Sequence, residues 1–265
     1  MEIIDFHAHC FPDELAHRAI ERVLTTSPGA KNWTDGTMAG LRTSMKAAGV
    51  TKSVVLPVAT RASQVSTINR GAPLLRAPDI IPFGALHPAA ENIDREISFM
   101  RMNAIRGIKL HPEFQNFNMD DPSVFPMYEA LAAAGLIVVF HTGTDPGPFT
   151  NDHSLPHMLA AVHRAFPRLR IVAGHMGGHQ VWNDVEKHLV GLPMYFETST
   201  APTNFQRKNF VRLCRRHGIE RILFGTDTPW FDQKSDREWI DGCGLTDNEK
   251  ELVFHKNAER LLADQ

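Results

Sequence analysis

The chain has 265 residues, of which 43% are hydrophobic and 22% charged, a composition typical of a globular protein that needs no disulfide to hold its core. Twenty-eight basic residues stand against 30 acidic ones, and a formal net charge of −2 favours neither nucleic acid nor an anionic membrane as a partner. We therefore expect the partner to be a small-molecule substrate.

Short apolar runs rich in Val, Ile, Leu and Phe recur along the chain, with helical segments between them. The runs cover residues 2–7, 53–58, 80–87, 106–111, 136–141, 170–175, 193–199 and 221–227, and amphipathic segments include 124–134, 154–166 and 205–217. This alternation predicts parallel sheet with crossover helices. Eight such units predict an α/β protein with the (β/α)₈ TIM-barrel fold. A doubly wound open sheet is the structural alternative.

One irregular stretch interrupts the alternation at residues 24–37, where Pro-Gly and Asp-Gly pairs follow the first predicted strand. We expect this stretch to be an excursion over the barrel mouth. No long linker or change of composition marks a domain boundary, so residues 1–265 are expected to form a single domain.

Cysteine usage and the N-terminal sequence favour a cytoplasmic protein. The three cysteines are widely spaced and include no C-x-x-C pair, which is typical of reduced thiols. The N-terminus is acidic rather than basic, so no signal peptide is expected. The longest apolar stretch, about residues 131–140, is shorter than the roughly 18 residues that a membrane helix needs.

Polar residues that can bind metals or substrates stand at the ends of most predicted strands. In chain order they are His7 and His9, His87, Lys109 and His111, His141, His175, and Asp227. The carboxyl ends of all strands of a parallel barrel open onto one face, where chemistry takes place. His7 and His9 are two residues apart and therefore face the same way on a strand. We expect these side chains to converge on one pocket that contains a metal site.

Imidazole nitrogens with one carboxylate suit a first-row divalent metal that keeps an open position for water. Such an ion lowers the pKa of its bound water and generates a nucleophile near neutral pH. Asp227 can bind the metal and also carry a proton, while His175 can polarise a carbonyl or orient the water. One ion is expected, zinc by default, with Mn²⁺ or Fe²⁺ as alternatives.

Six sequence stretches resemble the amidohydrolase superfamily, and most closely its branch that includes aminocarboxymuconate-semialdehyde decarboxylase. They are 5–9 (DFHAH), 107–112 (GIKLHP), 140–143 (FHTG), 173–178 (AGHMGG), 225–230 (GTDTPW) and 257–262 (NAERLL). The resemblance covers nearly the whole chain. It implies that His7, His9, His141 and Asp227 bind the metal, with Asp227 also the proton carrier. It implies that His175 acts on the substrate or binds a second metal.

The fourth predicted strand departs from related patterns. TatD-like nucleases have a glutamate there, which this chain replaces with Lys109. The polymerase-and-histidinol-phosphatase fold has a late Asp-x-His, which this chain lacks. Both departures argue against these alternatives. Lys109 could be a carbamate that bridges two metals, a free cation for a substrate carboxylate, or part of a structural ion pair. A second metal is expected only if Lys109 is carboxylated.

Other polar residues are less strongly predicted to lie in the pocket. His111 and His87 either line it or only cap their strands, and Arg61 either binds an acidic substrate or is solvated. His153 and His157 are expected on a solvated helix face. Glu197 is expected to support the ligands from behind, or to stand at the entry of a helix, rather than to bind the metal.

Three functions are compatible with these residues. The first is a metal-dependent hydrolase of the amidohydrolase type that attacks a small carbonyl, amide, lactone or ester substrate through metal-activated water. The second is a non-oxidative, metal-dependent decarboxylase of a small aromatic or enoic acid. The third is a barrel that binds metal or ligand without catalysis. The family resemblance also suggests a homodimer.

Overall fold

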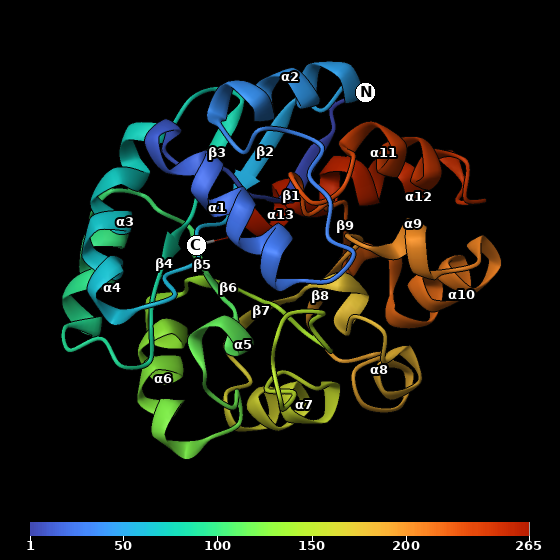
Figure 1. Ribbon diagram of the computed structural model, residues 1–265. Helices are drawn as coiled ribbons and strands as arrows, with labels where there is room; N and C mark the ends of the chain where they lie inside the picture. The colour runs from blue at the N-terminus through green and yellow to red at the C-terminus, as the bar shows by residue number, and fades with distance from the viewer. Residues whose placement is uncertain (265) are drawn as a thin grey trace.

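The structure, a computed structural model, describes residues 1–264 and shows a ring of parallel strands surrounded by helices (Figure 1). The strands are β1 (Ile4–Ala8), β2 (Lys52–Val55), β3 (Ile80–Pro82), β4 (Gly84–Ala85), β5 (Gly107–Leu110), β6 (Ile137–Phe140), β7 (Arg170–Ala173), β8 (Tyr195–Glu197) and β9 (Ile222–Leu223). Parallel pairing joins β1 to β3 in one run and β4 to β9 in a second run.

Backbone hydrogen bonds connect these two runs and close the barrel. The amide of Phe83 donates to the carbonyl of Val55 (3.0 Å), and the amide of Phe6 donates to the carbonyl of Phe224 (2.8 Å). The predicted third strand, 80–87, is therefore present as β3 and β4, interrupted at Phe83. The predicted (β/α)₈ barrel is confirmed, and the doubly wound alternative is wrong because the sheet closes.

Helices follow the strands around the outside of the barrel. They are α1 (Asp13–Thr26), α2 (Met38–Ala48), α3 (Val65–Gly71), α4 (Ile93–Met102), α5 (Pro112–Gln115), α6 (Phe125–Ala134), α7 (Pro156–Ala165), α8 (Trp182–His188), α9 (Ala201–Asn204), α10 (Arg207–His217), α11 (Gln233–Asp241), α12 (Asp247–Glu251) and α13 (Asn257–Ala263). Short 3₁₀ turns cover Ala62–Gln64, Ala72–Leu75, Pro122–Val124, His175–Gly177 and Ile219–Arg221, and a π-turn, Leu252–Lys256, joins α12 to α13.

Local sequence explains where many helices begin and end. The side chain of Thr37 accepts a hydrogen bond from the amide of Gly40 and caps the start of α2. Gly49 and Gly135 end α2 and α6 with left-handed backbone (φ of 70° and 67°), which glycine adopts without a Cβ penalty. The alternation seen in the sequence therefore has local causes at both ends of these helices.

Alternate residues of each strand face either the helices or the barrel interior. Val138 and Phe140 of β6 belong to the large apolar cluster under the helices, whereas Ile137 and Val139 belong to a separate interior cluster. Lys109 pairs in register with Val139 and so faces the interior as well. The apolar interior thus gives way to polar side chains toward the carboxyl ends of the strands.

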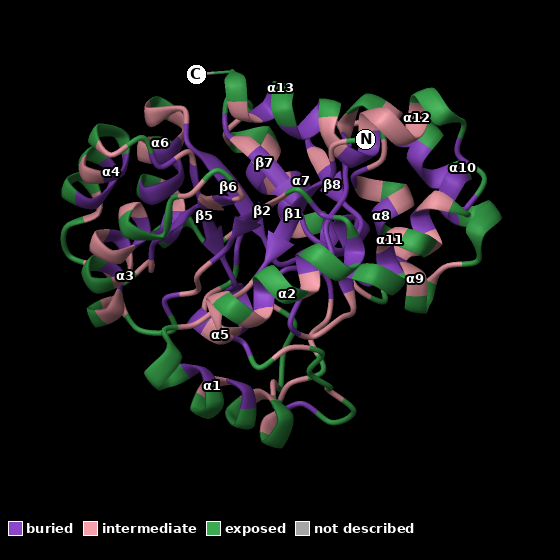
Figure 2. Cartoon of the chain, turned by 90° about the horizontal axis from the view of Figure 1, so that it is seen from above, coloured by how far each residue is buried: buried purple, intermediate pink, exposed green. Residues whose placement is uncertain are grey.

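Helix α1 and the irregular residues 27–37 lie at the mouth of the barrel. Figure 1 shows α1 crossing in front of the strands, and Figure 2 shows it beyond the ends toward which the strand arrows point. Only Ala16 and Ile20 of α1 are buried. The amide of Trp33 donates to the carbonyl of Pro229 (2.7 Å), which ties this segment to the loop after β9. No helix within residues 1–264 is long and apolar enough to cross a membrane.

Candidate functional site

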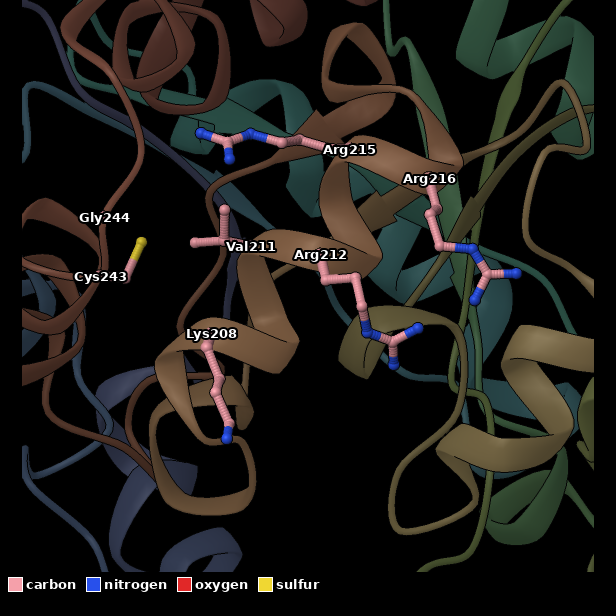
Figure 3. Close-up of a pocket in the computed structure, with 7 residues that line it drawn as sticks. All are labelled: Lys208, Val211, Arg212, Arg215, Arg216, Cys243 and Gly244. Carbon is pink, nitrogen blue, oxygen red and sulfur yellow. The ribbon is translucent and has the colours of Figure 1, made fainter.

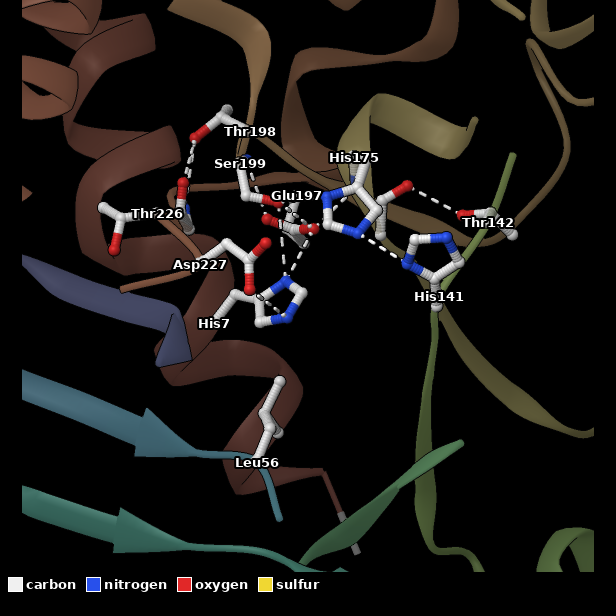
Figure 4. Close-up of polar contacts among 12 residues, drawn as sticks. His7, Leu56, His141, Thr142, His175, Glu197, Thr198, Ser199, Thr226 and Asp227 are labelled. Carbon is white, nitrogen blue, oxygen red and sulfur yellow. Dashed lines mark hydrogen bonds and ion pairs between the residues drawn. The ribbon is translucent and has the colours of Figure 1, made fainter. Parts of the chain in front are cut away.

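The end of β1 and the loop after β9 are held together by two backbone hydrogen bonds. The amide of Asp227 donates to the carbonyl of His7, and the amide of His9 donates to that of Thr228, both at 2.7 Å. Asp227 has a φ of 64°, which few residues other than glycine adopt. Strained backbone of this kind is concentrated at functional sites. Figure 4 shows the Asp227 carboxylate facing the His7 ring as a result.

Three of the four predicted metal ligands converge at this point. Nε2 of His7 and Nε2 of His9 lie 3.1 Å apart. Oδ1 of Asp227 lies 3.1 Å from Nε2 of His9 and 3.4 Å from Nε2 of His7. Ligand atoms about 2.0–2.2 Å from one zinc ion lie roughly 3–3.5 Å from one another. The spacing of these three atoms therefore matches a common metal ion.

Hydrogen bonds on the far side of each ring fix which nitrogen can bind the metal. Nδ1 of His9 lies 2.6 Å from the carbonyl oxygen of Leu56, and Nδ1 of His7 lies 3.0 Å from Oε1 of Glu197. Both partners only accept hydrogen bonds, so each Nδ1 carries the proton and each Nε2 keeps its lone pair. Two lone pairs that face each other at 3.1 Å repel unless a cation lies beside them, a place that a metal ion can take next to the Lys109 ammonium, which lies 3.2 Å from Nε2 of His7. The donor set therefore fits a divalent metal.

Lys109 brings a positive charge to this set of ligands. Its Nζ lies 3.2 Å from Nε2 of His7, and its side chain is only 1% exposed. Burial lowers the pKa of Lys109 to about 8, against the attraction of Asp227 and Glu197. Burial would raise the pKa of Asp227, but His7, His9 and Lys109 together hold it below its ordinary value. Lys109 thus places a buried amino group beside the candidate metal ligands.

Glu197 connects His7 on β1 to His175, which follows β7. Its Oε1 accepts hydrogen bonds from Nδ1 of His7 (3.0 Å), the amide of His175 (2.6 Å) and Oγ of Ser199 (2.7 Å). Burial would raise the pKa of this carboxylate, but His7 and the hydrogen bonds lower it. Figure 4 shows Glu197 behind the His7 ring, and it supports that ring in the way the sequence analysis expects.

His141 and His175 form a second pair of histidines. Nε2 of His175 lies 2.9 Å from Nδ1 of His141, and Nδ1 of His175 lies 2.7 Å from Oγ of Ser199. Both ring nitrogens of His175 thus have protein partners. The structure does not place His141 within the His7, His9 and Asp227 group. Among the described residues, His141 forms a group with His111 and Asp145, in addition to its contact with His175.

Two acidic residues that the sequence analysis missed lie beside His141. Oδ2 of Asp145 is 3.9 Å and Oε2 of Glu113 is 4.0 Å from Nε2 of His141. Burial raises the pKa of Glu113 to about 7. Both residues follow a strand-end histidine, Glu113 at two positions after His111 and Asp145 at four positions after His141. A search that included the first loop residues after each strand would have found them.

The remaining predicted site residues lie away from these contacts. Nδ1 of His87 accepts from the amide of Ala89 (3.1 Å), as a strand-end cap does, and Arg61 is exposed. The amide of His153 donates a hydrogen bond to Oε1 of Glu113 (3.1 Å). His153 therefore lies closer to the acidic residues beside His141 than the sequence analysis expects. The ring of His157 packs against that of His188, with centroids 6.0 Å apart.

A surface hollow of about 670 Å³ lies over α10, outside the barrel (Figure 3). Three of the four basic side chains that line it have acidic partners. Arg212 and Arg216 pair with Glu186, and Arg215 pairs with Glu249. Its lining contains no histidine or carboxylate and a single cysteine, Cys243, so this hollow is a poor candidate for catalysis.

Sequence comparison supports the resemblance on which the ligand set is based. Residues 4–263 match the profile of the amidohydrolase family. Gamma-resorcylate decarboxylase from Rhizobium radiobacter is 28% identical over 126 residues, which cover 41% of this chain and 38% of that enzyme. The chain thus matches about two fifths of the length of this curated relative.

Solved structures share the fold over the whole chain. An uncharacterised TIM-barrel protein from Bordetella bronchiseptica has a TM-score of 0.75 at 22% identity and covers 99% of both chains. A 5-carboxyvanillate decarboxylase from Novosphingobium aromaticivorans, with bound manganese and 3-methoxy-4-hydroxy-5-nitrobenzoic acid, has a TM-score of 0.72 at 14% identity and covers 98% of this chain and 97% of its own. From the profile match over nearly all its length, this protein belongs to the amidohydrolase family.

Proposed function

We propose that this protein is a metal-dependent decarboxylase that removes the carboxyl group of a small aromatic or enoic acid without oxidation. The observation that carries the proposal is the buried Lys109 ammonium beside the three converging metal ligands. A cation in this place can hold a substrate carboxylate against the metal site. Two of the three proteins named above are gamma-resorcylate decarboxylase and 5-carboxyvanillate decarboxylase, which favours this function over the hydrolase that the sequence analysis puts first.

His7, His9 and Asp227 would hold the metal in this proposal, and the resemblance adds His141. When bound there, a divalent ion supplies Lewis-acid stabilisation of negative charge on substrate oxygens. Zinc is the default for imidazole and carboxylate ligands, and the manganese in the Novosphingobium enzyme makes Mn²⁺ an equal candidate.

The residues of the chain have separate tasks in this reaction. Lys109 pairs with the carboxylate and orients it. The bond between the carboxyl carbon and its neighbour breaks, carbon dioxide leaves, and the electron pair is captured by a proton on the carbon left behind. Asp227, at the rim of the ligand group and 15% exposed, is the candidate carrier of that proton. His175 positions His141 and connects it to Glu197 through Ser199.

The experiment compares two substrate panels on metal-reconstituted protein. One contains hydroxybenzoic and enoic acids and is followed by carbon dioxide release. The other contains esters, lactones and amides and is followed by hydrolysis. We expect turnover in the first panel only, and loss of that turnover in Asp227→Asn but not in His157→Ala. Turnover confined to the second panel would replace this proposal with the hydrolase.

Metal uptake without turnover in either panel would support the non-catalytic barrel instead. The single-domain organisation, the homodimer and the cytoplasmic location expected from the sequence stay predictions.

A further inference from the structure

Ser199 lies just after β8 and bridges a carboxylate to the histidine that follows β7. Its Oγ is 2.7 Å from Oε1 of Glu197 and 2.7 Å from Nδ1 of His175. Figure 4 shows Ser199 beside both groups. We infer that Ser199 is a positioning residue, whose hydroxyl keeps the ring proton of His175 on Nδ1. Nε2 of His175 then presents a lone pair to the ring of His141.

The direction of the two hydrogen bonds follows from the protons that are available. A carboxylate only accepts, and a serine hydroxyl has one proton to donate. Oε1 of Glu197 already accepts from Nδ1 of His7 (3.0 Å) and from the amide of His175 (2.6 Å), as an ionised carboxylate does. Ser199 therefore donates to Glu197 and accepts from His175. Nδ1 of His175 must carry the proton of that second bond.

The burial of His175 leaves the ring a single proton. Burial disfavours a charged imidazole unless a carboxylate pairs with it. His175 is 3% exposed, and its ring nitrogens hydrogen-bond to Ser199 and His141 rather than to a carboxylate. With its one proton on Nδ1, the ring has its lone pair on Nε2, 2.9 Å from Nδ1 of His141. The family resemblance places His141 among the metal ligands, so the chain from Glu197 ends on the metal centre.

Glu197 also holds the backbones of both residues, so neither side chain is free to turn away. The amide of Ser199 donates to Oε2 of Glu197 (2.8 Å), while its hydroxyl donates to Oε1. The amide of His175 donates to Oε1, at a residue whose φ is 55°. Few residues other than glycine adopt this conformation. Ser199 is 0% exposed, so water cannot replace its hydroxyl.

Glu197 thus sets the proton position of two histidines from different strands. It accepts directly from Nδ1 of His7, and it acts on His175 through Ser199. Oγ of Ser199 is also 3.5 Å from Nδ1 of His7, which is long for a hydrogen bond and leaves the shorter bond to Glu197 in charge of that ring. Without Ser199, the ring of His175 would have no acceptor for a proton on Nδ1.

This tautomer limits what His175 does in the reaction, a consequence that rests on the proposed function. A ring with no proton on Nε2 accepts a hydrogen bond there and does not supply the proton that replaces the lost carboxyl group. That proton then has to come from another group, which agrees with Asp227 as its carrier. The proton position on His175 itself does not depend on which reaction is catalysed.

The first experiment records long-range ¹H–¹⁵N correlation spectra of zinc-loaded protein labelled with ¹⁵N-histidine. His175→Gln identifies the His175 signals by their loss. We expect a protonated Nδ1 and an unprotonated Nε2 in the wild type. In Ser199→Ala the proton should move wholly or partly to Nε2. Thr200→Ala is the matched control, because the hydroxyl of Thr200 is also buried but has no hydrogen-bond partner within the described chain.

Steady-state kinetics test the effect on turnover. Ser199→Ala should lower kcat by about 10- to 100-fold, as loss of a partner behind a metal-site histidine does, with little change in KM. Thr200→Ala should keep the wild-type kcat and the wild-type spectrum.

A proton on Nε2 of His175 in the wild type, alone or with one on Nδ1, would overturn the inference. This result needs only the wild type and His175→Gln, so it holds even if Ser199→Ala does not fold. A wild-type tautomer or an unchanged kcat in Ser199→Ala would also overturn it. If no acid is decarboxylated, the proposed function fails while the spectra still test Ser199.

Discussion

The amino group of Lys109 lies 3.2 Å from Nε2 of His7, and each side chain is 1% exposed. Lys109 lies on β5 and His7 on β1, so the pair brings together two strands that are far apart in the chain. A buried ammonium next to a metal-ligand nitrogen leaves a positive charge where an acidic substrate would meet the metal.

Lys109→Met should raise KM for the acid substrate by about 10- to 150-fold, because a hydrogen bond to a charged group contributes roughly 1.5–3 kcal/mol. Lys109→Arg keeps the charge and should recover part of this loss. Steady-state kinetics measure both effects. Metal content should not change in either variant. A fall in metal content in Lys109→Met would instead indicate a carboxylated lysine that bridges two ions.

Asp227→Asn should lower turnover by about 10²-fold or more, because it removes both a metal ligand and the proposed proton carrier. The fold should persist, since the backbone amide of Asp227 still donates to the carbonyl of His7. Turnover assays and circular dichroism check the two parts of this prediction. Asp241→Asn, an exposed aspartate of α11, is the matched control. Full activity in Asp227→Asn would remove Asp227 from the mechanism.

Gly225→Ala should disturb the metal centre without replacing a ligand. A Cβ at this position would lie 2.3 Å from Oε2 of Glu197 and 3.1 Å from Cβ of His7, so Glu197 would have to move. Overpacking of this kind costs about 1–3 kcal/mol of stability. Metal affinity, measured by titration, should fall as His7 loses its support. Gly71→Ala, where an added Cβ meets nothing within 4 Å, should leave affinity unchanged.

Asp236 should make the protein less stable as the pH rises. Burial, with the nearby charge of Asp5, raises the pKa of Asp236 to about 8, and its Oδ2 has no hydrogen-bond partner. The folded protein therefore keeps a proton on Asp236 that the unfolded chain, with an ordinary pKa of 3.8, releases. Between pH 4 and 8 the folded state binds the extra proton, so stability declines through this range.

Asp236→Asn should remove that decline. Between pH 5 and pH 8 its free energy of unfolding should rise relative to that of the wild type by on the order of a few kcal/mol. Denaturant unfolding of both proteins at the two pH values measures the change. Asp241→Asn, on the same helix but exposed, should follow the wild type. Parallel behaviour of wild type and Asp236→Asn would show that Asp236 is already ionised in the folded state.

The decision between hydrolysis and decarboxylation lay beyond the sequence. Both reactions use the ligands His7, His9 and Asp227, so the ligand pattern is the same for either. What separates them is the group that meets the substrate, and for Lys109 the sequence left three roles open. Its position against His7 depends on how β5 and β1 face each other inside the barrel.

The sequence by itself determined the barrel, the position of each strand and the kinds of side chain at the strand ends. These features follow from local periodicity and from helix caps such as Gly49 and Gly135, which act within a few residues. Even the break at Phe83 within the third strand left its place in the barrel unchanged.

Only the tertiary structure decided which nitrogen of each histidine is free to bind a metal. That choice depends on partners from distant strands, such as Leu56 for His9 and Glu197 for His7. It also placed Nδ1 of His141 against His175 and Nε2 of His141 toward Asp145. Hydrogen-bond partners far apart in the chain meet only when the barrel closes, so no local pattern could have assigned them.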